Sequence, residues 1–278
     1  MSSAEHVALR AFDADLFLLG HGLRDLARKE DVSARRRNEL GAWAASRGLH
    51  LRAVATGGPD AAARGLGASG ESSSVFIGRD EASLDAAIGW TRIEEAAGHV
   101  ERERAVRELG RLLGYPACCV DAFAAQPTGD DAASLGRLFG STPLGTIDPL
   151  CNFLLPGSPV RHVPCAWDCG ATHQAAREAL RRAAQVAPAV AASLRALMSC
   201  ALLVYDRFRV VVLVGQPRAD GTIAVSERYT LLDLCSDEAL HASPELRRFA
   251  RSASELPSEV PPTGLPGARL LRFSGTEP

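Results

Sequence analysis

The sequence lacks an excess of charge of either sign. Its 278 residues include 31 basic and 33 acidic side chains, which gives a net charge of −2 at pH 7. Without a positive field, the chain has no general attraction for nucleic acid or for an anionic membrane surface. Lys29 is the only lysine, and the arginine run Arg35 to Arg37 is not interleaved with aromatic residues. Nucleic-acid-binding surfaces usually combine the two, so we expect no nucleic-acid partner.

The sequence also lacks a long uninterrupted apolar run. Its most apolar stretch, Leu197 to Gly215, contains Asp206, Arg207 and Arg209. A membrane-spanning helix rarely tolerates such charges, so we expect no membrane partner. The N-terminus has no basic region followed by an apolar segment, and we therefore expect no signal peptide. These absences predict a cytoplasmic protein, in a compartment where thiols stay reduced.

Several standard signatures of cysteine and nucleotide chemistry are missing as well. The seven cysteines are an odd number, which excludes a complete internal disulfide framework. The chain has neither the two CxxC knuckles of a zinc ribbon nor the CxxCxxC run of bacterial ferredoxins. It also has no phosphate-binding glycine loop, no GxSxG elbow and no HExxH helix. Clustered cysteines in a reducing compartment instead indicate metal binding or catalysis.

The first cysteine phrase is GYPACCVDAF, from Gly114 to Phe123. Proline suits the first position of a helix, so we expect a helix to begin at Pro116 with Cys118 and Cys119 in its first turn. Adjacent residues on a helix lie about 100° apart, and the two thiols therefore point in different directions. The spacing to Phe123, a candidate core residue, predicts that Cys119 is the inner thiol and Cys118 the outer one.

The second phrase is RHVPCAWDCGATH, residues 161–173, in which Pro164 directly precedes Cys165. We expect a helix that begins at Pro164 and runs to about Val186. In such a helix, Cys169 lies one turn after Cys165 and on the same face. The phrase thus predicts a second helix start with thiols in its first turn.

Two helix N-termini that face each other would form a concave site lined by sulfur. A helix N-terminus carries partial positive charge and free N–H groups, which lower the pKa of a thiol. We therefore predict that Cys118, Cys119, Cys165 and Cys169 meet and bind a metal ion or an iron–sulfur cluster. The alternative is that all four are small buried residues, which free cysteine resembles.

The stretch LGRLLGYPACCVDAF, followed by RHVPCAWDCGATH, resembles a family of largely uncharacterised prokaryotic proteins. The marks of that family are a GYPxCCxxxF phrase and, downstream, an HxPCxxxC phrase. The resemblance covers about residues 106–181 and implies a cysteine site without supplying a reaction. A serine is expected near the end of the second phrase, and Thr172 stands closest to it here. The marked positions are Gly114, Tyr115, Pro116, Cys118, Cys119, Phe123, His162, Pro164, Cys165 and Cys169.

Polar residues beside the cysteines are candidates for catalytic roles. His162 can serve as a ligand, a proton donor or a helix cap. Tyr115 either donates a hydrogen bond into the site or packs in the core. Asp168 can orient a histidine or repel a thiolate, and His173 and Cys151 are alternative members of the site. The remaining cysteines, Cys200 and Cys235, are expected in the core.

Three functions fit these residues. The first is an iron–sulfur enzyme, namely an oxidoreductase, lyase or sulfur transferase, with a small-molecule substrate or a redox partner protein. The second is a structural zinc site in an accessory or binding protein. The third is a metal-free enzyme with Cys118 or Cys119 as nucleophile and His162 as base. Irregular spacing and soft thiolate ligands slightly favour iron–sulfur over zinc.

The pattern of apolar residues predicts an α+β fold. A helix-rich central region, 99–200, carries the cysteine site, and small β-elements flank it in the regions 1–98 and 201–278. Alternation and β-branched residues predict the strands, and apolar residues at helical spacing predict the helices. The expected strands are 6–19, 49–55, 74–80, 201–205, 207–214, 223–232 and 268–273. The expected helices are 34–47, 81–90, 99–113, 116–125, 132–139, 164–186, 188–200 and 236–252.

Overall fold

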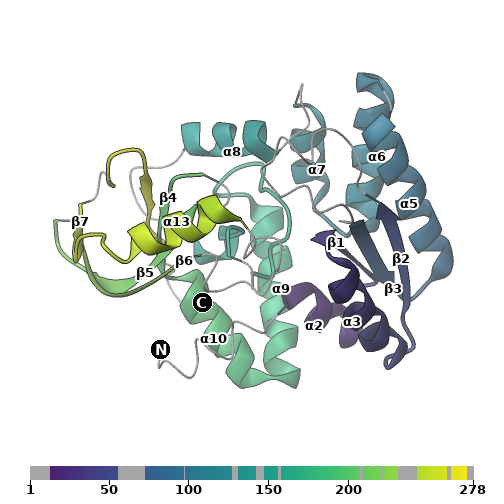
Figure 1. Ribbon diagram of the computed structural model, residues 1–278, viewed down its shortest axis with the longest axis horizontal. Coiled ribbons are helices and arrows are strands. Elements are labelled where there is room, and N and C mark those ends of the chain that lie inside the picture. Colours follow the sequence, from purple (N-terminus) through teal and green to yellow (C-terminus); the bar gives the residue numbers. More distant parts are fainter. Residues whose placement is uncertain are drawn as a thin grey trace.

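The computed structural model describes residues 13–55, 73–96, 98–126, 131–141, 147–155, 158–206, 209–220, 222–230, 243–261 and 264–273. The described part has the predicted α+β fold (Figure 1). A small sheet lies toward each end of the long axis, and most of the helical middle of the chain, apart from residues 99–112, lies between the two sheets. Within the described ranges, no helix combines the length and hydrophobicity needed to span a bilayer.

The N-terminal part is a three-stranded sheet covered by helices on both faces. Its strand order is β1-β3-β2, and β3 is antiparallel to both neighbours. Every residue of β3 is buried, which explains its apolar run Val75–Ile77. Val75 and Ile77 pack with α2 and α3, whereas Phe76 packs with α5 and α6 on the opposite face. The elements are α2 (Ala14–Gly20), β1 (Leu26–Val32), α3 (Ala34–Ala45), β2 (His50–Ala55), β3 (Ser73–Gly78) and α5 (Glu81–Ala96).

Two elements of this part differ from the sequence prediction. Residues 14–20 form helix α2 and not a strand, because Asp13 caps the helix by accepting hydrogen bonds from the N–H groups of Asp15 and Leu16. The sequence LARKEDV forms strand β1, which the apolar pattern did not predict because charged residues interrupt it. Lys29 of β1 is accommodated by ion pairs with carboxylates of the α2 segment. Residues 6–12 of the expected first strand lie outside the described residues.

The helical middle surrounds the two cysteine phrases. Helices α5 and α6 pack side by side, and α7 packs across the end of α6 (Figure 1). Helix α9 packs against α10, and η1 packs against both. The elements are α6 (His99–Leu112), α7 (Ala117–Ala124), α8 (Asp131–Gly140), η1 (Pro149–Cys151), α9 (Gly170–Val186) and α10 (Pro188–Met198).

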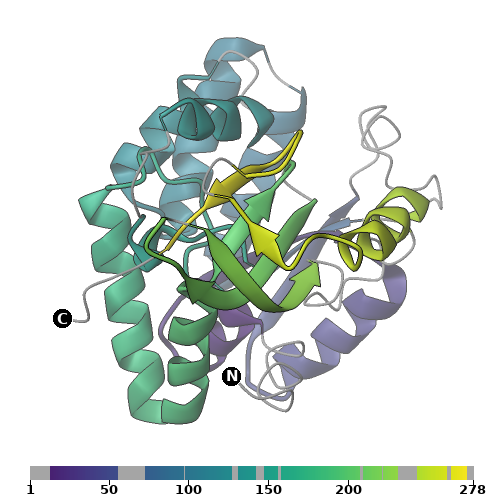
Figure 2. The same ribbon diagram turned by 90° about the vertical axis from the view of Figure 1, so that its left-hand side faces the viewer.

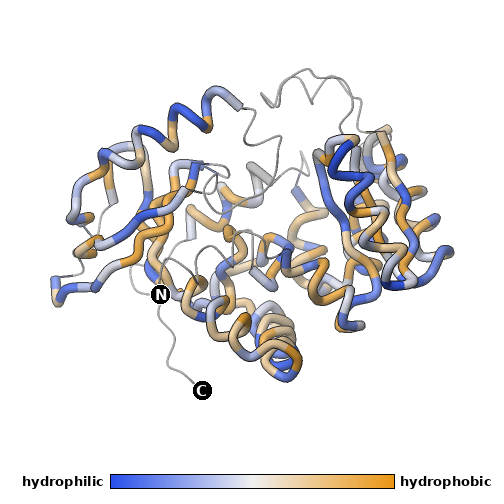
Figure 3. Tube along the Cα trace, turned by 60° about the horizontal axis from the view of Figure 1, so that its bottom comes forward, coloured by the Kyte–Doolittle hydropathy of each residue, from blue (hydrophilic) through white to orange (hydrophobic). Residues whose placement is uncertain are grey.

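The C-terminal part is a five-stranded antiparallel sheet with the order β7-β6-β5-β4-β8 (Figure 2). Strand β5 is buried on both faces over Val210–Leu213: Val210 and Val212 pack with α10 and η1, and Val211 and Leu213 pack toward α13. Hydrophobic and hydrophilic residues alternate along the helices (Figure 3). The elements are β4 (Ala201–Val204), β5 (Val210–Pro217), β6 (Ile223–Thr230), α13 (Pro244–Ala253), β7 (Glu259–Val260) and β8 (Arg269–Leu271).

Gly110 sets how closely α7, the helix that carries Cys118 and Cys119, approaches α6. A Cβ atom at Gly110 would lie only 2.6 Å from Cγ2 of the buried Val120. We therefore expect Gly110→Ala to lower the free energy of unfolding by about 1–3 kcal/mol, measured by urea denaturation. The matched control is Gly89→Ala in α5, where a Cβ meets nothing within 4 Å. That change should raise stability by about 0.5–1 kcal/mol, and equal effects of the two variants would contradict the packing argument.

Candidate metal centre

The GYP sequence forms the turn that aims α7 at the centre. Gly114 has a φ of +71°, its N–H donates to the carbonyl of Arg111, and the N–H of Tyr115 donates to the carbonyl of Gly110. This double hydrogen bond is a Schellman motif, which uses glycine because the left-handed conformation disfavours a Cβ. Pro116 is the N-cap of α7, which begins at Ala117, one position after the predicted helix start. The first turn of α7 therefore carries both cysteines, as the sequence predicts.

The second phrase differs from its prediction. Helix α9 begins at Gly170 with Cys169 as its N-cap, and the residues from Pro164 to Asp168 form a non-helical loop. The expected helix start at Pro164 is therefore wrong, and Cys165 and Cys169 do not share a helix face. Cys165 lies in the loop, and Cys169 lies at the helix N-terminus.

Two residues that the sequence prediction did not include hold this loop: Arg137 of α8 and Trp167 of the phrase itself. Arg137 of α8 donates hydrogen bonds to the carbonyl oxygens of Pro164 and Cys165, which a continuous helix would use for its own backbone. Trp167 packs in an aromatic group with Phe139 and donates its indole N–H to the backbone of α8 at 2.9 Å. In the sequence, the position of Trp167 between the predicted ligands Cys165 and Cys169 was the signal that could have identified it as a site residue.

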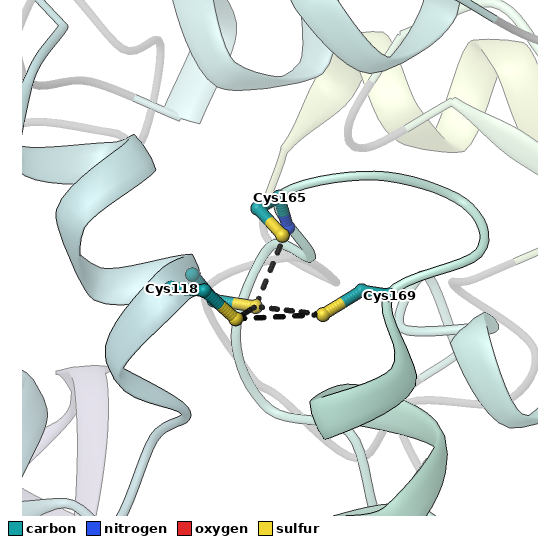
Figure 4. A group of neighbouring side chains, drawn as sticks. Cys118, Cys165 and Cys169 are labelled. Atoms are coloured by element: carbon teal, nitrogen blue, oxygen red, sulfur yellow. Dashed lines mark hydrogen bonds between the residues drawn. The ribbon is translucent and has the colours of Figure 1, made fainter.

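The four predicted cysteines meet at one point. Their Sγ atoms all lie within 4.8 Å of one another, so the group can hold a metal ion. Cys118 Sγ lies 3.9 Å from that of Cys119 and 3.7 Å from that of Cys169, and the latter two are 3.6 Å apart. Cys165 faces them from the loop, and its N–H donates to Cys119 Sγ at 3.3 Å (Figure 4). Cys119 is 2% exposed and Cys118 is exposed, which agrees with the inner and outer positions expected from the sequence.

Hydrogen bonding lowers the pKa of one thiol of the centre, that of Cys169. Burial raises the pKa of Cys169, but hydrogen bonds involving Thr172, Cys165 and Cys119 outweigh it and lower the pKa to about 6. Burial raises the pKa of Cys119, and burial together with Cys169 raises that of Cys165 to about 11. At neutral pH Cys169 is therefore a thiolate, and a metal ion that binds has to displace the protons of Cys119 and Cys165.

His162 approaches the centre through an intermediary. Its Nε2 lies 3.0 Å from the hydroxyl oxygen of Thr172, which in turn lies 3.3 Å from Cys119 Sγ. Thr172 is fully buried, and Tyr115 covers the His162 ring with a centroid separation of 5.3 Å. Burial and the positive charge of Arg24 lower the pKa of His162 to about 4, so the imidazole is neutral at pH 7. His162 is thus outside the group of metal-capable atoms and contacts one of its members through Thr172.

The other candidates lie apart from the four sulfur atoms. Asp168 is exposed and forms no hydrogen bond or ion pair with the residues that the structure describes. His173 turns its Nδ1 toward Asp148, with 3.7 Å to the carboxylate oxygen. Cys151 is fully buried beneath the second phrase, with its Sγ 4.0 Å from the carbonyl oxygen of Ala166. Cys200 packs at the edge of the core, as expected, and Cys235 lies outside the described residues.

No protein-family model matches this chain. No curated protein and no solved structure is significantly similar to it. The family resemblance of the two cysteine phrases therefore stays a prediction, and the function has to be inferred from the centre itself.

Proposed function

We propose that this protein is a metalloprotein in which the thiolates of Cys118, Cys119, Cys165 and Cys169 bind a single metal ion. The spacing of the sulfur atoms carries this proposal. Zinc–thiolate bonds of about 2.3 Å place the sulfurs at the corners of a tetrahedron with edges of about 3.8 Å. Three of the sulfur pairs are separated by 3.9, 3.7 and 3.6 Å, which fits those edges.

Zinc is the ion that this donor set favours. A complete set of four thiolates is typical of structural zinc sites, which leave no open position for a substrate. An ion bound here would join helix α7 to the loop before α9. The proposed role is therefore structural, in a protein whose activity lies in binding or in assisting another reaction.

An iron–sulfur enzyme that acts on a small molecule is the second candidate. Two observations support it: Cys118 is exposed, which gives the centre an edge toward solvent, and the N–H of Cys165 points at Cys119 Sγ. Such N–H donors to sulfur tune the reduction potential of clusters. Against it, the four thiolates of a [4Fe–4S] cluster bind four different iron atoms, so the sulfurs would have to move farther apart. A metal-free cysteine nucleophile has less support, because His162 reaches the thiols only through Thr172.

Metal and sulfide analysis of anaerobically purified protein tests the proposal. We expect about one zinc or iron ion per chain without acid-labile sulfide, and intense thiolate-to-metal absorption after replacement of the ion by cobalt(II). Iron and acid-labile sulfide in equal amounts would instead support the iron–sulfur enzyme and contradict a single bound ion. A chain that binds none of these ions, with four freely alkylated thiols, would contradict both candidates.

A further inference from the structure

A buried carboxylate gathers three cations beside the metal centre. Asp15 is 3% exposed and accepts a hydrogen bond from Arg24 on one oxygen, while its other oxygen lies 2.9 Å from Lys29 Nζ and 3.0 Å from Arg161 Nε. Lys29 also pairs with Asp13 at 2.6 Å. Burial opposes ionisation of Asp15, but the three cations hold its pKa well below the usual range. This charge cluster of Asp13, Asp15, Arg24, Lys29 and Arg161 therefore contains one positive charge more than its two carboxylates balance.

The charge cluster is continuous with the wall of the centre. Arg161 directly precedes His162 in the chain, and the His162 ring packs against that of Tyr115. On its other side, His162 hydrogen-bonds to Thr172, which contacts Cys119. A chain of direct contacts therefore leads from the cations to the sulfur atoms. A group bound at the cations would lie beside the centre and not on a remote surface.

This junction contains donors that the protein leaves unused. A guanidinium has five N–H donors, and among the described residues Arg24 uses one of them, toward Asp15. Its side chain is 18% exposed. The hydroxyl of Tyr115 forms no hydrogen bond with any described residue, and burial together with Asp15 raises its pKa to about 12, so it remains a donor. Both side chains are only partly buried, so a ligand can reach these donors.

We propose that Arg24 and Tyr115 form an anion-binding subsite for a carboxylate or phosphate group of a small-molecule ligand. The planar fork of a guanidinium pairs with either oxyanion through two parallel hydrogen bonds, and the tyrosine hydroxyl supplies a third donor. The bound anion balances the excess positive charge of the cluster. The next carboxylate, Glu30, pairs with Arg28, which also pairs with Glu94. The subsite goes beyond the proposed metal site and does not depend on which ion the centre holds.

Titration of the metal-loaded protein with inorganic phosphate, and separately with acetate, tests this subsite. We expect saturable binding of at least one probe by calorimetry, with a shift of the Arg24 side-chain N–H resonance. Arg24→Gln should weaken that binding about tenfold or more while Asp15 keeps two other cations and the metal content is unchanged. Arg24→Lys keeps the charge without the fork and should fall in between. The matched control is Arg35→Gln, an arginine of α3 with a side chain that is 77% exposed.

Equal affinity in Arg24→Gln and the unaltered protein would overturn the proposal, as would the absence of saturable binding of both probes. If Arg24→Gln fails to fold, Tyr115→Phe tests the subsite in its place. This change keeps the ring against His162 and removes only the hydroxyl. Unchanged affinity in that variant would then overturn the subsite. Probe binding by a chain that holds no metal would uphold the subsite and count against the metal centre, so the two proposals fail separately.

Discussion

Cys169→Ser is expected to empty the metal centre and to lower the free energy of unfolding by about 3 kcal/mol or more. Cys169 Sγ lies within 3.7 Å of the sulfurs of both Cys118 and Cys119, and Cys169 is the thiol with the lowered pKa. Serine has nearly the same shape, but its hydroxyl is a poor ligand for a soft metal. Serine is also a good helix N-cap, so the start of α9 at Gly170 should survive. The loss would therefore report the missing metal bond.

Metal content per chain, together with urea unfolding with and without a chelator, measures this effect. Cys200→Ser is the matched control, because that thiol lies outside the group of four sulfurs and hydrogen-bonds to the carbonyl oxygen of Ala196 in α10, so the variant should keep the metal. Cys118→Ser should weaken metal binding less than Cys169→Ser, since water can reach this exposed position and replace the ligand. A Cys169→Ser protein with full metal content would show that the four sulfurs are not a ligand set.

Asp15→Asn is expected to lower the free energy of unfolding by about 3–5 kcal/mol. The change keeps the shape of the side chain but removes the charge that holds Arg24, Lys29 and Arg161 together in a poorly solvated place. Urea denaturation at neutral pH measures the loss. Asp85→Asn is the control, since that carboxylate is 69% exposed and its pair with Arg52 contributes little. Equal small effects of the two variants would mean that water screens the charge cluster.

The pH dependence of stability separates this charge effect from a packing defect. The folded-state pKa of Asp15 is lower than its ordinary value of 3.8. The stability that ionised Asp15 contributes is therefore complete at pH values above its ordinary pKa. It is lost as the pH falls toward the folded-state pKa. The unaltered protein should lose this stability as the pH falls below about 4, and Asp15→Asn should lack that part of the acid slope. Parallel pH profiles of the two proteins would exclude the assignment.

Local sequence patterns predicted those elements whose cause is local. Strands β3 and β5 are buried on both faces, so their apolar runs are visible in the sequence. The meeting of the two cysteine phrases followed from their repeated Pro-Cys beginnings. The start of α9 could not be predicted in the same way. The side chain of Arg137, from helix α8, donates hydrogen bonds to the backbone carbonyls of Pro164 and Cys165. A local sequence pattern does not reveal a hydrogen-bond donor that comes from a distant helix.

The charge cluster shows the same limit over a longer range. Asp15 and Arg161 are 146 residues apart in the chain, and neither stands in a motif that indicates a partner. Strand β1 was missed for a related reason: its charged residues look unsuitable for a buried sheet until Asp13 and Asp15 are placed beside Lys29. Thr172 was singled out only as the place of an expected serine, and its contacts with Cys119 and His162 depend on the tertiary fold.

The segment from Arg161 to Cys169 is fastened at both ends by means that do not involve metal. Asp15 holds Arg161 at its start, and Arg137 and Trp167 hold the loop against α8. Because these ties remain when the ion leaves, the empty centre keeps its thiols near their bound positions. Reloading then requires capture of an ion and release of protons, without prior refolding of the chain. The rate of uptake should accordingly rise in proportion to the concentration of free metal, and a delivery partner would only have to hand over its ion.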